Sequence, residues 1–161
     1  MNIQTARCTI RAFQRDELDA FMEYRNNLEW MRYQGFKGLA KERYEQELFL
    51  NQSLDNGRQY AIINRTTGQL IGDVYLKREQ TICWIGYTIH PRFKQQGYAQ
   101  EAVRALICWA SEQGYSRLKA GVHPENKASI KLLEKLDFVY LTQDCDELIY
   151  VYDLEKELFQ K

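Results

Sequence analysis

The sequence predicts one α+β domain, in which helices flank a mixed β-sheet. Three observations carry this prediction. The length of 161 residues suits one domain and is enough to bury a core. Segments with a strand-like period of two lie on both sides of segments with a helical period. The sequence contains no repeats, linkers or low-complexity segments, so we expect a single domain over residues 1–161.

The first part of the chain combines one strand with two helices. Apolar and polar residues alternate over Arg7–Phe13, which predicts a strand. Asp16 is a suitable N-cap for a helix that continues to about Arg25. A second helical pattern covers Lys41–Leu54, and the segment between the helices, Asn26–Leu39, has no clear period.

Three antiparallel strands are expected next. Gln59–Asn64 and Gln69–Leu76 flank a turn over Arg65–Gly68, where glycine accommodates a positive φ. Thr81–Ile89 is the third strand. Gly86 within it suggests a bulge or a close approach of another backbone.

The last part of the chain alternates helices with strands. Apolar residues at helical spacing predict helices over Tyr98–Gln113 and Asn126–Leu136. Arg117–Val122 between them reads as a short strand, parallel to the preceding one because a helix makes the connection. The closing antiparallel strands are expected at Phe138–Thr142 and Leu148–Leu154.

Composition excludes several classes of protein. The 22 basic and 22 acidic side chains balance, which argues against direct nucleic-acid binding. The longest apolar runs, such as Ala105–Ala110, are too short to span a membrane, and the N-terminus lacks a secretory signal. Four widely spaced cysteines and two histidines predict neither a disulfide framework nor a metal site. We expect a cytoplasmic monomer or homodimer.

A polar loop follows the strand that ends at Ile89. Arg92–Gly97 leads from this strand into a helix, and free backbone N–H groups at a helix start attract anions. Gly97 has no Cβ to obstruct a ligand, and Lys94 adds positive charge. The loop therefore favours a site for the pyrophosphate of a nucleotide-bearing cofactor. An ordinary strand-to-helix turn is the competing interpretation.

A second polar segment, His123–Ser129, follows the neighbouring parallel strand. The carboxyl ends of such strands open a crevice, so the two segments are expected to share one site. By itself the second segment has a simpler interpretation. Asn126 would cap a helix, and Ser129 would lie in the first turn.

These two segments carry a resemblance to a known family. Ile89–Ala102, with Lys94, Gly97 and Ala99 in register, resembles the acetyl-CoA loop of the GNAT N-acetyltransferases, Arg/Gln-x-x-Gly-x-Gly/Ala. Pro124–Phe138 resembles the Asn-x-x-Ser helix of the branch that includes the ribosomal-protein N-terminal acetyltransferases. The resemblance implies a twisted mixed sheet of about seven strands, with helices on both faces and a splay between two central parallel strands.

The resemblance also implies acetyl-CoA as the cosubstrate and assigns residues to it. The strand with Tyr87 and Ile89 would pair with the pantetheine arm, and Asn126 would contact the cofactor. The implied pyrophosphate loop consists of Lys94, Gln95, Gln96, Gly97, Tyr98 and Ala99. The chain departs from the family where Leu133 replaces the usual tyrosine acid and Trp84 replaces a carboxylate.

The expected reaction is direct transfer of an acetyl group to a primary amine. Ser129 is our candidate to protonate the leaving thiolate, and packing in its helix is the alternative. Asp73, in the middle of a strand, is the first candidate for the base that accepts the amine proton. Glu29, Glu147 and His123 are alternatives.

The acceptor is expected beside the least regular part of the chain. Trp30, Tyr33 and Asp73 are the candidate substrate-binding residues, although the two aromatic rings would fit a core equally well. The acceptor amine is a protein N-terminus or a small molecule, such as an aminoglycoside-type compound or a polyamine. A non-catalytic acyl-CoA-binding module is the competing class, because the usual tyrosine and glutamate are absent.

Overall fold

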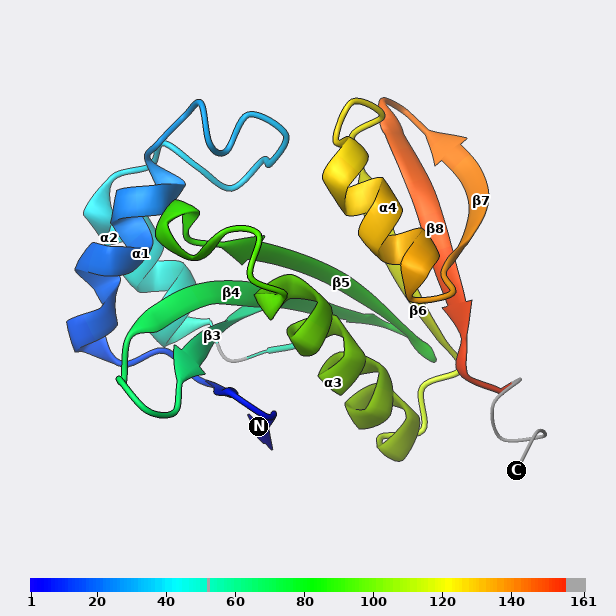
Figure 1. Cartoon of the computed structure of the whole chain (residues 1–161), viewed down its shortest axis with the longest axis horizontal. Coiled ribbons are helices and arrows are strands. Elements are labelled where there is room, and N and C mark those ends of the chain that lie inside the picture. Colours follow the sequence, from blue (N-terminus) through cyan, green and yellow to red (C-terminus); the bar gives the residue numbers. More distant parts are fainter. Residues whose placement is uncertain (52, 156–161) are drawn as a thin grey trace.

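An eight-stranded sheet forms the centre of the computed structural model, which describes residues 1–51 and 53–155 (Figure 1). The strand order is β1-β2-β3-β4-β5-β6-β8-β7, and only the pair β5–β6 is parallel. The strands are β1 (Asn2–Gln4), β2 (Cys8–Arg11), β3 (Arg58–Asn64), β4 (Leu70–Glu79), β5 (Ile82–Ile89), β6 (Arg117–Val122), β7 (Val139–Asp144) and β8 (Glu147–Asp153). The predicted domain also includes residue 52 and residues 156–161, which lie outside the described residues.

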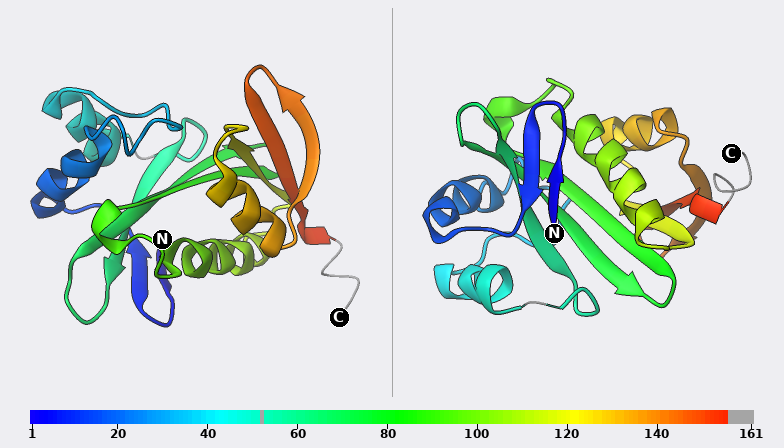
Figure 2. Two further views of the ribbon diagram at one scale, coloured as in Figure 1. Left: turned by 45° about the horizontal axis from the view of Figure 1, so that its top comes forward. Right: turned by 90° about the horizontal axis from the view of Figure 1, so that it is seen from below.

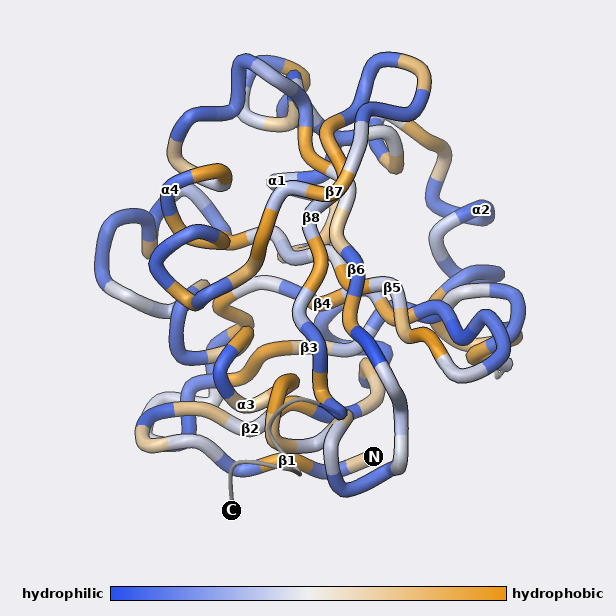
Figure 3. Tube along the Cα trace, turned by 90° about the vertical axis from the view of Figure 1, so that its right-hand side faces the viewer, coloured by the Kyte–Doolittle hydropathy of each residue, from blue (hydrophilic) through white to orange (hydrophobic). Residues whose placement is uncertain are grey.

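Helices cover both faces of the sheet (Figure 2). On one face, α1 (Leu18–Arg25) and α2 (Lys41–Glu45) pack around Phe21 and Tyr44. On the other face, α3 (Tyr98–Glu112) and α4 (Lys127–Lys135) pack through a larger cluster that includes Leu106 and Leu133. Hydrophobic residues line the strands and α3, whereas hydrophilic residues dominate the loops (Figure 3). The predicted fold class is confirmed.

The structure differs from the predicted elements in four places. Asp16, the predicted N-cap of the first helix, lies inside a 3-10 turn over Arg15–Glu17 that Gln14 caps. The strand β1 was not expected, because three residues are too few to show alternation. The predicted helix over Lys41–Leu54 consists of α2 and one π-helical segment, Gln46–Leu50, before the backbone becomes extended at Asn51. The bulge suggested at Gly86 is absent from the β4–β5 pair, and the register shifts instead at Ile62/Ile63 in β3–β4 and at Tyr140/Thr142 in β7–β8.

The two central parallel strands separate, as predicted. Ile82–Trp84 of β5 pairs with Arg117–Lys119 of β6, and the pairing stops there. Beyond this point β5 stays paired with β4, and β6 stays paired with β8. Each strand therefore keeps a hydrogen-bonded neighbour on its outer side, so the two halves of the sheet separate without leaving either strand unpaired on both edges (Figure 1).

Among the described residues, no helix is both long and apolar enough to cross a membrane. The same residues contain no cluster of His, Cys, Asp and Glu side chains that could hold a metal ion.

Candidate active site

A cavity of about 770 Å³ occupies the splay. Residues of β5, including Trp84 and Tyr87, line it on one side, and Gly121 of β6 faces them. Further walls come from the loop before α2, from the start of α4 and from the β7–β8 hairpin. The cavity therefore joins Tyr87 and Asn126 of the predicted cofactor segments to Tyr33 of the predicted acceptor segment, whereas Ile89 and the predicted pyrophosphate loop, residues 94–99, lie outside its lining.

The loop between β5 and α3 has the geometry of an anion cradle. Gln95 and Gly97 have left-handed backbones, with φ values of 59° and 82°. Within the described part of the chain, the N–H groups of Gln95, Gln96 and Gly97 donate to no protein acceptor. They lie at the start of a 15-residue helix, whose dipole adds positive charge. These residues fit a pyrophosphate group.

The side chains of this loop divide into two kinds. Lys94, Gln95 and Gln96 are exposed. The Tyr98 ring is buried in the core, so this residue offers a ligand its backbone N–H only. Ala99 follows in the first turn of α3 with a small side chain that leaves the cradle open. Binding of the pyrophosphate by these residues remains a prediction.

Two hydroxyl groups meet on the cofactor side of the cavity. The Tyr87 phenol and the Ser129 hydroxyl are hydrogen-bonded at 2.6 Å. Burial raises the pKa of Tyr87 to about 12, and the hydrogen bond with Ser129 lowers it only in part. The phenol therefore keeps its proton at neutral pH. No local pattern predicts this pair, because its members lie 42 positions apart.

The start of α4 supports both interpretations of its sequence. The side-chain oxygen of Asn126 accepts a hydrogen bond from the Ser129 backbone N–H at 3.3 Å, which confirms the cap. Asn126 and Leu133 also line the cavity. The cap orients the serine, while contact between Asn126 and the cofactor stays a prediction.

Asp73 lies in a closed network beneath the cavity. Its side chain is fully buried, and Arg25 Nη2 lies 2.6 Å from its Oδ1 atom. The Tyr24 hydroxyl donates to the other carboxylate oxygen, and Gln59 Nε2 lies 3.4 Å from Oδ1. Burial and the negative charge of Asp73 raise the pKa of Tyr24 well above its usual value.

Within this network Asp73 holds the side chain of Arg25. Arg25 lines the cavity, and it also donates to the Phe36 carbonyl oxygen at 2.9 Å and to the Thr88 hydroxyl at 3.3 Å. Asp73 itself does not line the cavity. Its role as the base remains an untested prediction, and its surroundings favour the alternative role of holding Arg25.

Glu147 presents an accessible carboxylate on the opposite wall. It is the first residue of β8, and its carboxylate lies against Gly121, where a Cβ atom would overlap it. The side chain is exposed and lines the cavity with Asp144 and Cys145 of the same hairpin. Among the alternative bases, His123 also lines the cavity, whereas Glu29 does not.

The predicted acceptor residues have different surroundings. Tyr33 lines the cavity, and its ring stacks against His123 with the centroids 4.9 Å apart. This contact joins the loop before α2 to the loop before α4. The Trp30 indole N–H instead donates to the Ile89 carbonyl oxygen at 2.9 Å, outside the cavity lining. Trp30 thus connects the segment between α1 and α2, which holds the predicted acceptor residues, to the end of β5.

Comparisons with known proteins agree on one family. Residues 7–139 match the model of the acetyltransferase (GNAT) domain. The chain is 30% identical to the uncharacterized N-acetyltransferase YnaD of Bacillus subtilis over 141 residues, which cover 84% of this chain and 81% of YnaD.

Solved structures show the same fold. A GNAT-family acetyltransferase from Bacillus anthracis has a TM-score of 0.86 and 24% identity, covering 96% of this chain and 99% of its own. RimL, a ribosomal L7/L12 α-N-protein acetyltransferase solved with coenzyme A, has a TM-score of 0.79 and 17% identity, covering 95% and 98%. The second structure belongs to the branch that the helix motif resembles.

Proposed function

The chain belongs to the GNAT acetyltransferase family, and on this premise we propose that it transfers an acetyl group from acetyl-CoA directly to a primary amine. One observation supports the proposal above the others. A hydroxyl pair, Tyr87 and Ser129, and an accessible carboxylate, Glu147, line the same cavity. An acyl transfer to an amine needs both a proton donor and a proton acceptor.

The cofactor side would hold acetyl-CoA through backbone groups. The free N–H groups at Gln95, Gln96 and Gly97 suit the pyrophosphate. The edge of β5 beyond Trp84 has no strand partner on the β6 side, which leaves its backbone available to the pantetheine arm. When bound, acetyl-CoA supplies the acetyl group as a thioester.

The protein side chains would handle the protons. A primary amine has a pKa of about 8 to 10, so it must lose a proton before it can attack. We assign this proton to Glu147, directly or through water, because its carboxylate is accessible and unpaired within the described residues. As the new C–N bond forms and the C–S bond breaks, Ser129, backed by the Tyr87 phenol, donates to the departing sulfur.

The acceptor side favours a positively charged substrate. Three carboxylates, Glu47, Asp144 and Glu147, line the cavity. Arg25 is neutralised by Asp73, and Arg43 lies 3.4 Å from Glu47. The N-terminus of a protein and a small polyamine both satisfy this charge pattern. RimL is named for the first kind of acceptor.

Release of free thiol from acetyl-CoA tests the proposal. The acceptor panel comprises peptides with free N-termini, diamines, polyamines and aminoglycosides. The same peptides with acetylated N-termini serve as matched controls, since they lack the acceptor amine. Turnover of at least one free amine, with none for its blocked counterpart, is expected.

Two other results would change the conclusion. Thermal stabilisation by CoA without thiol release for any acceptor would favour an acyl-CoA-binding module. No stabilisation by CoA at all would refute both functions.

A further inference from the structure

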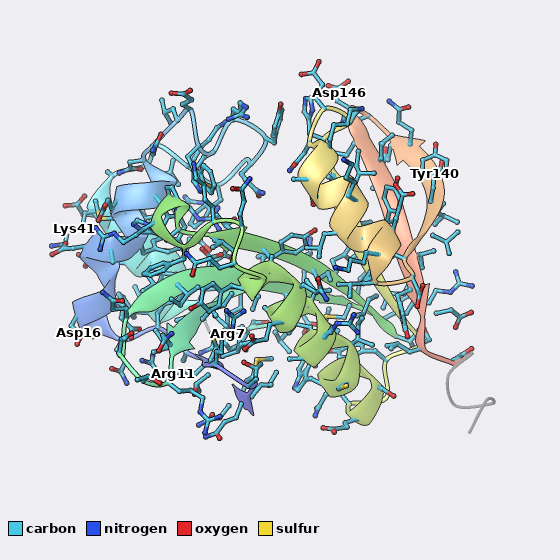
Figure 4. The ribbon with its side chains drawn as sticks, viewed as in Figure 1. Arg7, Arg11, Asp16, Lys41, Tyr140 and Asp146 are labelled. Carbon is cyan, nitrogen blue, oxygen red and sulfur yellow. The ribbon has the colours of Figure 1, made fainter. Side chains whose placement is uncertain are left out.

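Arg7 occupies an unusual position at the start of α3, although it belongs to the turn before β2 (Figure 4). Its Nε atom lies 2.7 Å from Glu101 Oε1, and its backbone N–H donates to Glu101 Oε2 at 2.9 Å. Its guanidinium carbon lies 4.0 Å from the centre of the Tyr98 ring. A Cβ atom placed on Gly97 would lie 3.5 Å from Arg7 Nη2. Arg7 therefore contacts Tyr98 and lies beside the position that a side chain at residue 97 would take.

The partner of Arg7 is a carboxylate in the first turn of α3. Burial pushes the pKa of Glu101 up, but hydrogen bonds from Thr5 and Arg7 outweigh it, and the net pKa is lowered. The carboxylate is therefore ionised at neutral pH. A negative charge suits a helix start when no ligand is present. A bound pyrophosphate would be repelled by the same charge.

Arg7 supplies the compensating charge. The guanidinium uses its Nε atom for Glu101, while among the described residues no hydrogen bond occupies Nη1 or Nη2. The side chain is 41% exposed, so its positive charge is accessible from solvent. Stacking on Tyr98 and two hydrogen bonds to Glu101, one from the side-chain Nε and one from the backbone N–H, hold Arg7 in place.

We propose that Arg7 is a positioning residue for the cofactor: it neutralises Glu101 and packs on Tyr98, so that the start of α3 can accept the pyrophosphate of CoA. The inference rests on the proposed function for the identity of the ligand. It adds a residue from the N-terminal hairpin, outside both sequence motifs, to the cofactor site.

A cycle of charge variants tests this role through CoA binding, measured by calorimetry without turnover. Arg7→Met retains an apolar stem over Tyr98 but leaves Glu101 unneutralised, so CoA should bind roughly five- to tenfold more weakly. The double variant Arg7→Met/Glu101→Gln should recover most of the affinity. Glu101→Gln alone should bind CoA at least as tightly as the wild type.

Two controls separate the charge effect from other causes. Arg7→Lys keeps the charge and the backbone hydrogen bond to Glu101, so it should bind CoA within about twofold of the wild type. Arg117→Met removes one exposed positive charge from the start of β6, where the strands are still paired, and should leave CoA affinity unchanged. Circular dichroism verifies that each variant is folded.

The ligand can also be varied. Dephospho-CoA lacks the 3′-phosphate but keeps the pyrophosphate, so Arg7→Met should weaken its binding by the same factor. Loss of the effect with this ligand would assign Arg7 to the 3′-phosphate and overturn the proposal. So would wild-type affinity in Arg7→Met, or a double variant no better than the single one.

If Arg7→Met does not fold, the CoA affinity of Glu101→Gln tests the proposal instead. Weaker CoA binding by Glu101→Gln than by the wild type would overturn the proposal. Absence of CoA binding by the wild type would instead refute the proposed function.

Discussion

Two arginine–carboxylate pairs flank β5, the predicted cofactor strand, and they differ chiefly in burial. Arg25 and Asp73 have side chains that are 3% and 0% exposed, whereas Arg7 and Glu101 are 41% and 17% exposed. Both pairs have short contacts, at 2.6 and 2.7 Å. In the buried pair neither charge can be left alone, so its role is in the fold. In the exposed pair solvent screens the contact, and a ligand can still respond to the charges.

This difference in burial gives the two arginine–carboxylate pairs different roles. The buried pair joins α1 to β4 and, through Thr88, to β5. The exposed pair joins the N-terminal hairpin to α3. Glu147 supplies the contrasting case of a carboxylate with no ion-pair partner among the described residues, on a wall of the cavity. Ion pairing thus separates the carboxylates of Asp73 and Glu101 from those of Glu147 and Asp144, which line the cavity and form no ion pair among the described residues.

The largest effect is expected from Asp73→Ala, which breaks the buried pair. It leaves the Arg25 guanidinium buried without a counter-charge, and should lower the free energy of unfolding by about 3–5 kcal/mol. Urea denaturation measures the change. Asp55→Ala, which breaks an exposed pair with Arg78, is the control and should behave like the wild type. If Asp73→Asn kept its stability but lost turnover, Asp73 would return as the candidate base.

The unpaired carboxylate is expected to matter for rate rather than stability. Glu147→Gln should lower kcat by about 100-fold or more, because no base then takes the amine proton, while CoA affinity stays unchanged. Asp146→Asn changes the neighbouring residue at the tip of the same hairpin, which does not line the cavity, and should retain activity (Figure 4). Equal rates in the two variants would contradict the assignment of Glu147.

The exposed pair should contribute little to stability. Arg7→Met is expected to cost about 1 kcal/mol or less in unfolding free energy, in contrast with its effect on CoA binding. The lowered pKa of Glu101 means that its share of stability is present above the unfolded pKa and is lost on acidification. Urea denaturation should therefore give different free energies of unfolding for the wild type and Glu101→Gln at neutral pH. The two values should converge at acidic pH. A large loss at neutral pH would make this pair structural too.

The last effect concerns Tyr87 and is absent at neutral pH. Its pKa of about 12 lies above that of an unfolded tyrosine, so the folded chain keeps a proton that the unfolded chain loses. Stability should be unaffected below about pH 10 and should fall between pH 10 and 12. Ultraviolet titration of the wild type and Tyr87→Phe would show whether the late-titrating phenol disappears. If the difference between the two titration curves had its midpoint near pH 10, the burial argument would be contradicted.

The sequence by itself determined the order of most elements, the glycine-containing turn before α3 and the cap at Asn126. These features depend on local properties: the spacing of apolar residues, a glycine with positive φ, and a side chain that bonds to a backbone N–H three residues away. For the same reason the prediction failed where local signals are short, as in β1 and the π-helical segment after α2.

Only the tertiary structure decided what the charged and hydroxyl side chains do. Asp73 becomes a buried partner because α1, 48 positions away, places Arg25 against it. Tyr87 meets Ser129, and Arg7 meets Glu101, through packing that joins residues 42 and 94 positions apart. No periodicity in the sequence records such contacts, because they depend on how the β-sheet and the helices assemble. The pairing of each charge, and hence its chemistry, is therefore set by the assembled fold.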